Sequence, residues 1–101
     1  MPIYITEYGA PTNGPGIGAT LADLHLGEYP DHVDEATQAA MATQSAQLAY
    51  ADANVKALFW YSNTDRGLLP TTNENFFGLR RNDGSAKPAY AAFAAAISAT
   101  H

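Results

Sequence analysis

The chain has 101 residues, of which ten are acidic and five are Lys or Arg, so its formal net charge is −5. That length fits one small domain, and a hydrophobic share of 47% indicates a globular rather than a disordered chain. The chain has no basic cluster, which argues against binding to nucleic acid or to anionic membranes. The absence of cysteine excludes disulfides and thiolate metal sites, and no apolar run approaches the ~20 residues of a membrane span.

The first predicted strand covers residues 2–8, which are rich in β-branched and aromatic side chains. Alternation predicts two faces, with Ile3, Ile5 and Glu7 on one and Tyr4 and Thr6 on the other. A chain rarely starts its core at residue two, so we interpret Met1 as a start inside a longer protein. No secretory signal precedes the strand, and localisation stays unassigned, with a secreted parent protein as one option.

A long loop is predicted over residues 9–33, where Gly, Pro, Asn, Asp and Thr are frequent. Asp34 is the predicted N-cap of a helix that runs to about Asp52, and Glu35 suits the first turn because of the helix dipole. Mostly small residues recur at helical spacing, which predicts close packing against a sheet. This stripe consists of Met41, Ala42, Ser45, Leu48, Ala49 and Asp52.

Residues 55–61 (VKALFWY) predict a second strand, apolar on both faces and therefore of the type that is buried on both sides. A second long loop follows over residues 62–87 and contains an Asn82-Asp83-Gly84 turn. Pro88 suits the first turn of a helix that runs to about Ala99. Its apolar residues at helical spacing are Tyr90, Phe93, Ala94 and Ile97.

Strands that alternate with helices predict an α/β fold with parallel strands. Both long loops follow strands, whereas the helix-to-strand connector is short. Loops longer than ~12–15 residues are usually functional. This asymmetry is typical of a (β/α)8 TIM barrel, whose active site lies at the C-terminal ends of the strands, where Glu7 and Trp60 are placed.

Three segments together carry a resemblance to a known group of enzymes. They are residues 3–12 (IYITEYGAPT), 57–67 (ALFWYSNTDRG) and 76–93 (FFGLRRNDGSAKPAYAAF). They resemble, in order, strand seven, strand eight and the segment before the last helix of clan A (β/α)8-barrel retaining glycoside hydrolases, of cellulase-like character. The resemblance implies that residues 1–101 are the C-terminal βαβα segment (β7-α7-β8-α8) of a catalytic domain, and hence a partial barrel.

The resemblance also implies cleavage of β-glycosidic bonds in poly- or oligosaccharides, with Glu7 as nucleophile and without a cofactor. Trp60 would offer an apolar face to a sugar ring, while Tyr8 and Asn63 would hydrogen-bond to sugar hydroxyls or to Glu7. His25 is the better candidate for substrate contact in the first loop. The family acid/base is a glutamate at the end of strand four, usually after asparagine, and no such segment exists in this chain.

Each of these residues also has a structural interpretation, and these alternatives stay open. Glu7 would be a solvated strand-edge residue and Trp60 a core residue. Tyr8 would be a packing residue and Asn63 a turn residue.

The first loop also carries five residues of metal-ligand type, namely Asp23, His25, Asp31, His32 and Asp34. Their spacing fits no standard zinc or calcium pattern, so we expect no metal site. Arg80 and Arg81 are expected to be solvated, or paired with carboxylates of the same loop.

Two functions from different classes remain. The chain is part of a retaining hydrolase that holds half of the catalytic pair, or it is a non-catalytic assembly module or inactive fragment that keeps the motif. Two parallel strands cannot close a barrel, so the expected partners are the missing N-terminal barrel segment or further copies of the chain, besides a carbohydrate substrate. In these families the peptide bond after the strand-eight tryptophan is often cis, so we expect a cis Trp60–Tyr61 bond where barrel-like packing is kept.

Overall fold

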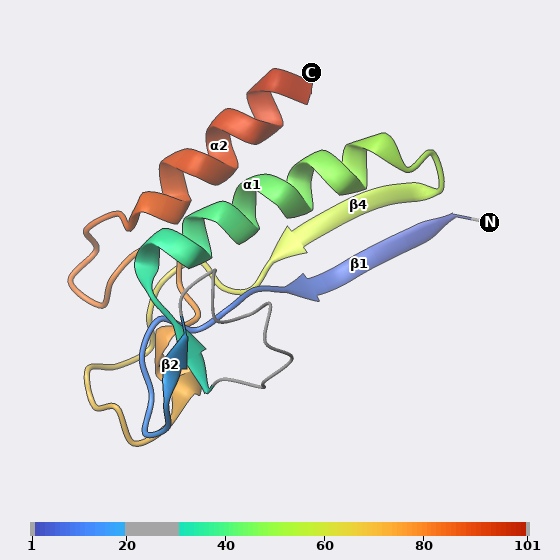
Figure 1. Ribbon diagram of the computed structural model, residues 1–101. Helices are drawn as coiled ribbons and strands as arrows, with labels where there is room; N and C mark the ends of the chain where they lie inside the picture. Colours follow the sequence, from blue (N-terminus) through green and yellow to red (C-terminus); the bar gives the residue numbers. More distant parts are fainter. Residues whose placement is uncertain (1, 20–30, 101) are drawn as a thin grey trace.

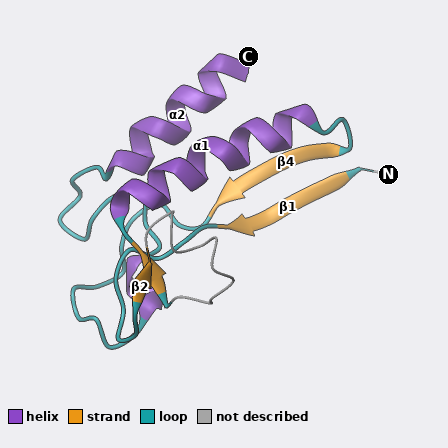
Figure 2. Ribbon diagram, in the orientation of Figure 1, coloured by secondary structure: helices purple, strands orange, loops and turns teal. Residues whose placement is uncertain are grey.

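Two parallel strands lie side by side, and two helices cover one face of this sheet (Figures 1 and 2). The computed structural model describes residues 2–19 and 31–100. Its main elements are β1 (Ile3–Tyr8), α1 (Glu35–Ala51), β4 (Val55–Trp60) and α2 (Pro88–Thr100). These bounds confirm the predicted strands and helices to within one residue, and the parallel pairing of β1 with β4 confirms the α/β class. None of the described helices has the length and apolarity to span a bilayer.

The two long loops contain short elements that the sequence did not predict. β2 (Gly18–Ala19) and β3 (His32–Val33) form a second parallel pair within the first loop. The second loop contains a 3-10 helix, η2 (Asn73–Phe76), whose N-cap Thr72 accepts a hydrogen bond from the Glu74 amide. Elements of two to four residues have no periodicity that a sequence pattern can reveal.

Helix α1 begins as predicted but buries a different face. The carboxylate of Asp34 caps the helix, because its Oδ1 accepts a hydrogen bond from the Thr37 amide at 2.7 Å. The buried residues of α1 are Thr37, Gln38, Ala42 and Ala46. Leu48, which the predicted stripe included, is 71% exposed. The prediction of the stripe was therefore wrong in part, because α1 packs against α2 as well as β4, and this second neighbour rotates the buried face away from Leu48.

The register of β1 against β4 is irregular at two places, between Ile3 and Tyr4 and between Ile5 and Tyr8, and the second irregularity changes which face Glu7 occupies. Ile5 pairs with Leu58 and Tyr8 with Trp60, so three steps along β1 match two steps along β4. Ile5, Tyr8 and Leu58 line one cavity beneath α1 and therefore share the helix-covered face. Glu7, next to Tyr8 and exposed, lies on the opposite face. The predicted grouping of Glu7 with Ile5 was wrong, because simple alternation does not anticipate a bulge.

The face of the sheet opposite the helices is bare among the described residues. Tyr4 is 63% exposed and Phe59 is 59% exposed, although both belong to the central part of a strand. Residues 55–61 have the composition of a strand that is buried on both sides, but the two helices cover one face only, so the apolar residues of the other face are exposed (Figure 1).

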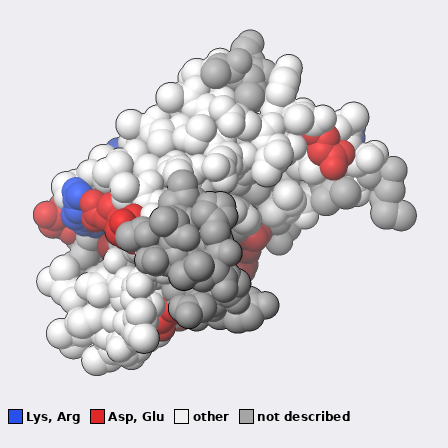
Figure 3. Space-filling view, viewed as in Figure 1, with Lys and Arg blue, Asp and Glu red and all other residues white. Residues whose placement is uncertain are grey.

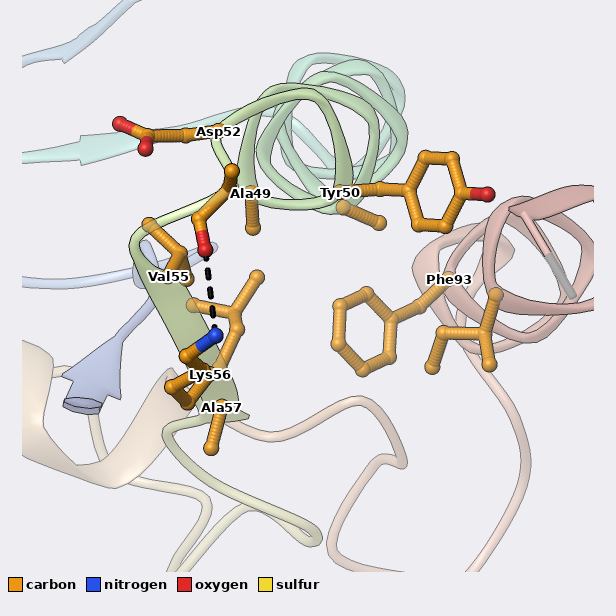
Figure 4. A pocket seen from close by; sticks show the side chains of 11 residues that line it. Ala49, Tyr50, Asp52, Val55, Lys56, Ala57 and Phe93 are labelled. Atoms are coloured by element: carbon orange, nitrogen blue, oxygen red, sulfur yellow. Dashed lines mark hydrogen bonds between the residues drawn. The ribbon is translucent and has the colours of Figure 1, made fainter. Parts of the chain in front are cut away.

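The other face is packed by small residues. Ala89 and Ala96 are the buried residues of α2, with Phe93 half-buried, whereas Tyr90 and Ile97 from the predicted stripe are more exposed. Between α1, α2 and the start of β4 the packing leaves a cleft of about 460 Å³, with Phe93 lying on its α2 side (Figure 4). Most of the surface over the two helices carries no charged side chain (Figure 3).

A buried ion pair joins both long loops to the start of α2. Lys87 is 2% exposed and Asp65 is 7% exposed, and Nζ of Lys87 lies 2.8 Å from Oδ1 of Asp65. The ammonium also donates to Oγ1 of Thr12 at 2.9 Å and to the carbonyl of Phe76 at 3.2 Å. The same Asp65 oxygen accepts from the Gly78 amide. Three acceptors thus satisfy the three ammonium protons, which is the condition for burying a lysine at tolerable cost.

Replacing Lys87 by methionine is expected to destabilise the fold by about 3–5 kcal/mol, because it leaves the Asp65 carboxylate buried without its cation. Urea unfolding monitored by circular dichroism would measure the loss. Lys56→Met is the matched control, since Lys56 is exposed, and its effect should stay within about 0.5 kcal/mol. Equal effects of the two substitutions would refute a structural role for the buried pair.

Candidate functional site

Glu7 lies at the C-terminal end of β1 on the bare face of the sheet, and it is exposed. Gly9 follows two residues later, where the chain passes against the end of β4. A side chain at Gly9 would collide with the carbonyl of Tyr61, so glycine is what allows this close approach. The end of β4 is thereby held directly beside the segment that carries Glu7.

Tyr8 and Trp60 lie on the helix-covered side of the sheet. Their rings pack edge to face with centroids 5.8 Å apart, and the indole also contacts Phe93 of α2 at 5.7 Å. The Trp60 Nε1–H donates to the carbonyl of Phe77 at 3.3 Å. Trp60 packs against the hydrophobic cluster that includes Ala42 and is half-buried there, so only part of its surface is open to a ligand.

Tyr61 follows directly after β4 ends, and continued strand alternation would place it on the side of Glu7. Its amide donates to the carbonyl of Tyr8 at 2.8 Å, its ring lies 5.3 Å from the Phe77 ring, and its hydroxyl donates to Oε2 of Glu74 at 3.3 Å. The cis peptide bond is Tyr61–Ser62, not the expected Trp60–Tyr61. A cis Trp60–Tyr61 bond was expected only where barrel-like packing is kept, and among the described residues the sheet has two strands and one bare face.

The other predicted contacts lie in the loops. Asn63 is exposed, and its carbonyl accepts a hydrogen bond from the Arg80 amide at 3.0 Å. His25 and Asp23 lie outside the described residues. The imidazole Nδ1 of His32 lies 3.0 Å from Oδ2 of Asp31.

Asn73 donates to the Asp31 carbonyl at 2.9 Å, and Asp34 is engaged as the helix cap. Within residues 2–19 and 31–100, no group of three or more potential metal ligands converges.

The two arginines of the second loop are paired, but not with acids of that loop. Arg81 binds Glu35 of α1 in a bidentate manner, with Nη2 to Oε1 at 2.7 Å and Nε to Oε2 at 3.2 Å. The hydrogen bond and charge of Glu35 raise the pKa of Arg81 above its ordinary value. Arg80 lies over the ring of Tyr90 at 4.3 Å. For Arg81 the alternative of pairing within the loop was wrong, because the loop folds back onto the start of α1, while the salt bridge itself stays partly solvated.

The turn at 82–84 forms as predicted. The Gly84 amide donates to the Arg81 carbonyl at 2.8 Å, and Gly84 has a φ of 90°, a conformation that glycine adopts without strain. Hydrogen bonds from the hydroxyl and amide of Ser85 lower the pKa of the Asp83 carboxyl.

Two residues near this end of the sheet were not predicted from the sequence. Gln38 is fully buried, and its Nε2 donates to the carbonyls of Ala10 at 3.0 Å and Gly78 at 3.2 Å. It thus ties the loop after β1 to the loop after β4. Glu74 follows Asn73 in the sequence, as the acid/base glutamate of the resembled enzymes follows an asparagine, but it lies in η2 rather than at a strand end. For Gln38 the available signal was a glutamine inside an alanine-rich helix. For Glu74 no periodic signal existed.

Comparisons with known proteins show which solved structures share the fold. No family model and no curated protein sequence matches the chain. Among solved structures, it matches a family 39 glycoside hydrolase from Bacteroides cellulosilyticus WH2 with a TM-score of 0.73 and 24% identity, over 100% of this chain and 17% of that one. It also matches GH5_18 from Streptomyces cattleya in complex with GlcNAc, with a TM-score of 0.69 and 24% identity over 98% of this chain and 20% of that one.

A variant of the same Streptomyces cattleya protein, in complex with Manβ1-4GlcNAc, gives a TM-score of 0.67 at 24% identity, over 96% of this chain and 20% of that one. The chain therefore has the fold of a part of these glycoside hydrolases and spans about a fifth of their length or less.

Replacing Gln38 by methionine is expected to destabilise the fold by about 2–4 kcal/mol, because two buried carbonyls lose their donor. Chemical unfolding would measure the change, and amide hydrogen exchange should show faster exchange in the loops after β1 and β4. Gln44→Met, on the exposed side of α1, is the control. A silent Gln38→Met variant would show that Gln38 does not hold the two loops together.

Proposed function

We propose that residues 1–101 are the C-terminal βαβα segment, strands seven and eight with their helices, of a retaining glycoside hydrolase. The activity would be cellulase-like cleavage of β-glycosidic bonds in poly- or oligosaccharides, with Glu7 as nucleophile. The observation that carries this proposal is the position of Glu7, exposed at the C-terminal end of a parallel strand, on the face that the helices leave bare. The fold match to parts of glycoside hydrolases supports the same class.

In this proposal Glu7 attacks the anomeric carbon and forms a glycosyl-enzyme, while a second carboxyl protonates the leaving oxygen. The same carboxyl then removes a proton from the water that releases the sugar. Retention requires the two carboxyls to be about 5–5.5 Å apart. The second carboxyl is the part of the pair that another segment would supply.

The bare face suggests which aromatic ring receives the sugar. Tyr61 lies on the side of Glu7, is buttressed by Phe77 and has its hydroxyl next to Glu74. We therefore assign the sugar-stacking role to Tyr61, with its hydroxyl and Glu74 as partners for sugar hydroxyls. Trp60 and Tyr8 support this ring from the helix side and contribute contact only through their open edges. Asn63 and His25 remain proposed loop contacts.

The isolated chain is expected not to hydrolyse aryl β-glycosides, because general acid–base catalysis contributes about 10²–10⁴ in rate and half of the pair is absent. Chromogenic turnover assays on the full chain test this expectation. Turnover that disappears in Glu7→Gln would contradict it and would mean that another residue or copy supplies the acid.

A chimaera tests the nucleophile itself. The chain would replace the structurally matching segment of the family 39 glycoside hydrolase. Turnover should then be lost in Glu7→Ala and partly restored by azide, a small anion that fits the space of the missing carboxylate. Asp52→Asn, an exposed acid at the end of α1, should leave turnover unchanged. An active chimaera that tolerates Glu7→Ala would refute the assignment.

A non-catalytic assembly module is the second candidate, and the exposed aromatic residues favour it. Tyr4 and Phe59 expose apolar rings on the bare face, and the outer edges of β1 and β4 have no strand neighbour among the described residues. Such surfaces drive association with other strands or copies.

We therefore expect the isolated chain to self-associate at micromolar concentration, as measured by light scattering. A double variant with Tyr4→Ser and Phe59→Ser should shift it toward monomer. Ile17→Ser, which removes an 84% exposed side chain from a loop, should not. A compact monomer of the unmodified chain would count decisively against this expectation.

A further inference from the structure

A polar pocket of about 300 Å³ lies between the loop after β1 and the loop after β4, and it is formed by residues other than Glu7. The first loop contributes Thr12 and Asn13, and the second contributes Asp65, Leu68 and Asn82. This volume is at the lower end of what small-molecule sites in proteins enclose. The pocket is therefore suited to a ligand of about monosaccharide size.

The charges that line the pocket cancel in pairs. The Asp65 carboxylate is held by Lys87 at 2.8 Å, and the Glu35 carboxylate is held by Arg81 at 2.7 Å. Glu35 and Arg81 both line the pocket, and because each charge there already has its partner, neither an anion nor a cation meets an uncompensated charge. The pocket consequently favours a neutral ligand.

Unused hydrogen-bonding groups remain on these same side chains. Asp65, which is 7% exposed, uses Oδ1 for both Lys87 and the Gly78 amide, which leaves Oδ2 as an acceptor. Asn82 donates through Nδ2 to the Asp65 carbonyl, which leaves its side-chain oxygen. The Thr12 hydroxyl accepts from Lys87 and keeps its own proton to donate. Asn13 accepts from the Gly14 amide and keeps its side-chain N–H groups. Acceptors and donors therefore line one cavity.

The remaining wall is apolar and includes the Phe76 ring and Leu68. Hydrogen-bond donors and acceptors together with apolar surface match a ring that carries several hydroxyls and presents C–H groups on its faces. We propose that this pocket binds a neutral polyhydroxylated small molecule of monosaccharide size. The site is independent of Glu7 and stands even without catalysis by that residue.

Saturation-transfer NMR on the full chain, with all variants compared at one protein concentration, tests the proposal with D-glucose as the probe. We expect a dissociation constant on the order of millimolar and at least ~10-fold weaker binding of D-glucuronate, because its carboxylate faces Asp65 and Glu35. Asn82→Ala should weaken glucose binding by about 3–10-fold, the equivalent of one lost hydrogen bond between neutral groups. Gln44→Ala, on the exposed side of α1, is the matched control and should change nothing.

Three results would overturn the proposal. They are an absence of saturation transfer up to about 50 mM glucose, equal binding of glucose and glucuronate, and unchanged binding in Asn82→Ala. If Asn82→Ala fails to fold by circular dichroism, Asn13→Ala gives the same comparison from the other loop. Glu7→Gln separates the two sites, since the pocket keeps its affinity in that variant. Loss of glucose binding there would assign the sugar to the Glu7 face and refute the pocket.

Discussion

The buried pair of Lys87 and Asp65 is the constraint on which the C-terminal end of the sheet depends. The two loops that follow the strands have little regular structure of their own, yet they must hold fixed positions for any site at this end to exist. One ammonium group contacts Thr12 of the first loop, Asp65 and Phe76 of the second, and belongs to the residue that precedes α2. Because an uncompensated buried charge is far more costly than a paired one, the three segments are held together or lost together.

The layer formed by α1, α2 and the sheet is held together by packing rather than by polar contacts. Buried alanines bring α1 close to α2 and to β4, so that small side chains cover one face of the sheet. Where larger side chains are absent, a cleft remains between the helices and β4. Gln38 connects the helix packing to the two loops. It is buried within α1, and its side chain donates hydrogen bonds to one carbonyl in each loop. The segments that carry Glu7 and Tyr61 are tied directly by the hydrogen bond from the Tyr61 amide to the Tyr8 carbonyl and by the close approach at Gly9.

The strands, the helices, the N-cap and the parallel order could be predicted because each has a local signature of periodicity or capping. The buried faces of α1 and α2 could not, since they depend on which neighbour a helix contacts, and alanine-rich stripes of nearly equal hydrophobicity do not decide between faces. The pairing of Arg81 with Glu35 joins residues 46 positions apart and has no local signal. The face of Glu7 depends on one extra residue in the register, which alternation cannot reveal.

That extra residue has a physical cause. Without the bulge, Glu7 would share the face of Ile5 and point under α1, where its carboxylate would be desolvated among alanines without a cation, at a cost of several kcal/mol. With the bulge, Tyr8 takes the covered face, where its ring packs on Trp60, and the carboxylate reaches the bare face. In the observed register the Glu7 carboxylate is exposed, the Tyr8 ring packs on Trp60 and Gly9 allows the close approach to Tyr61. This register presents a carboxylate on the face of the sheet that the helices leave bare. Further strands would have to complete that face, so the chemistry of Glu7 depends on a partner segment.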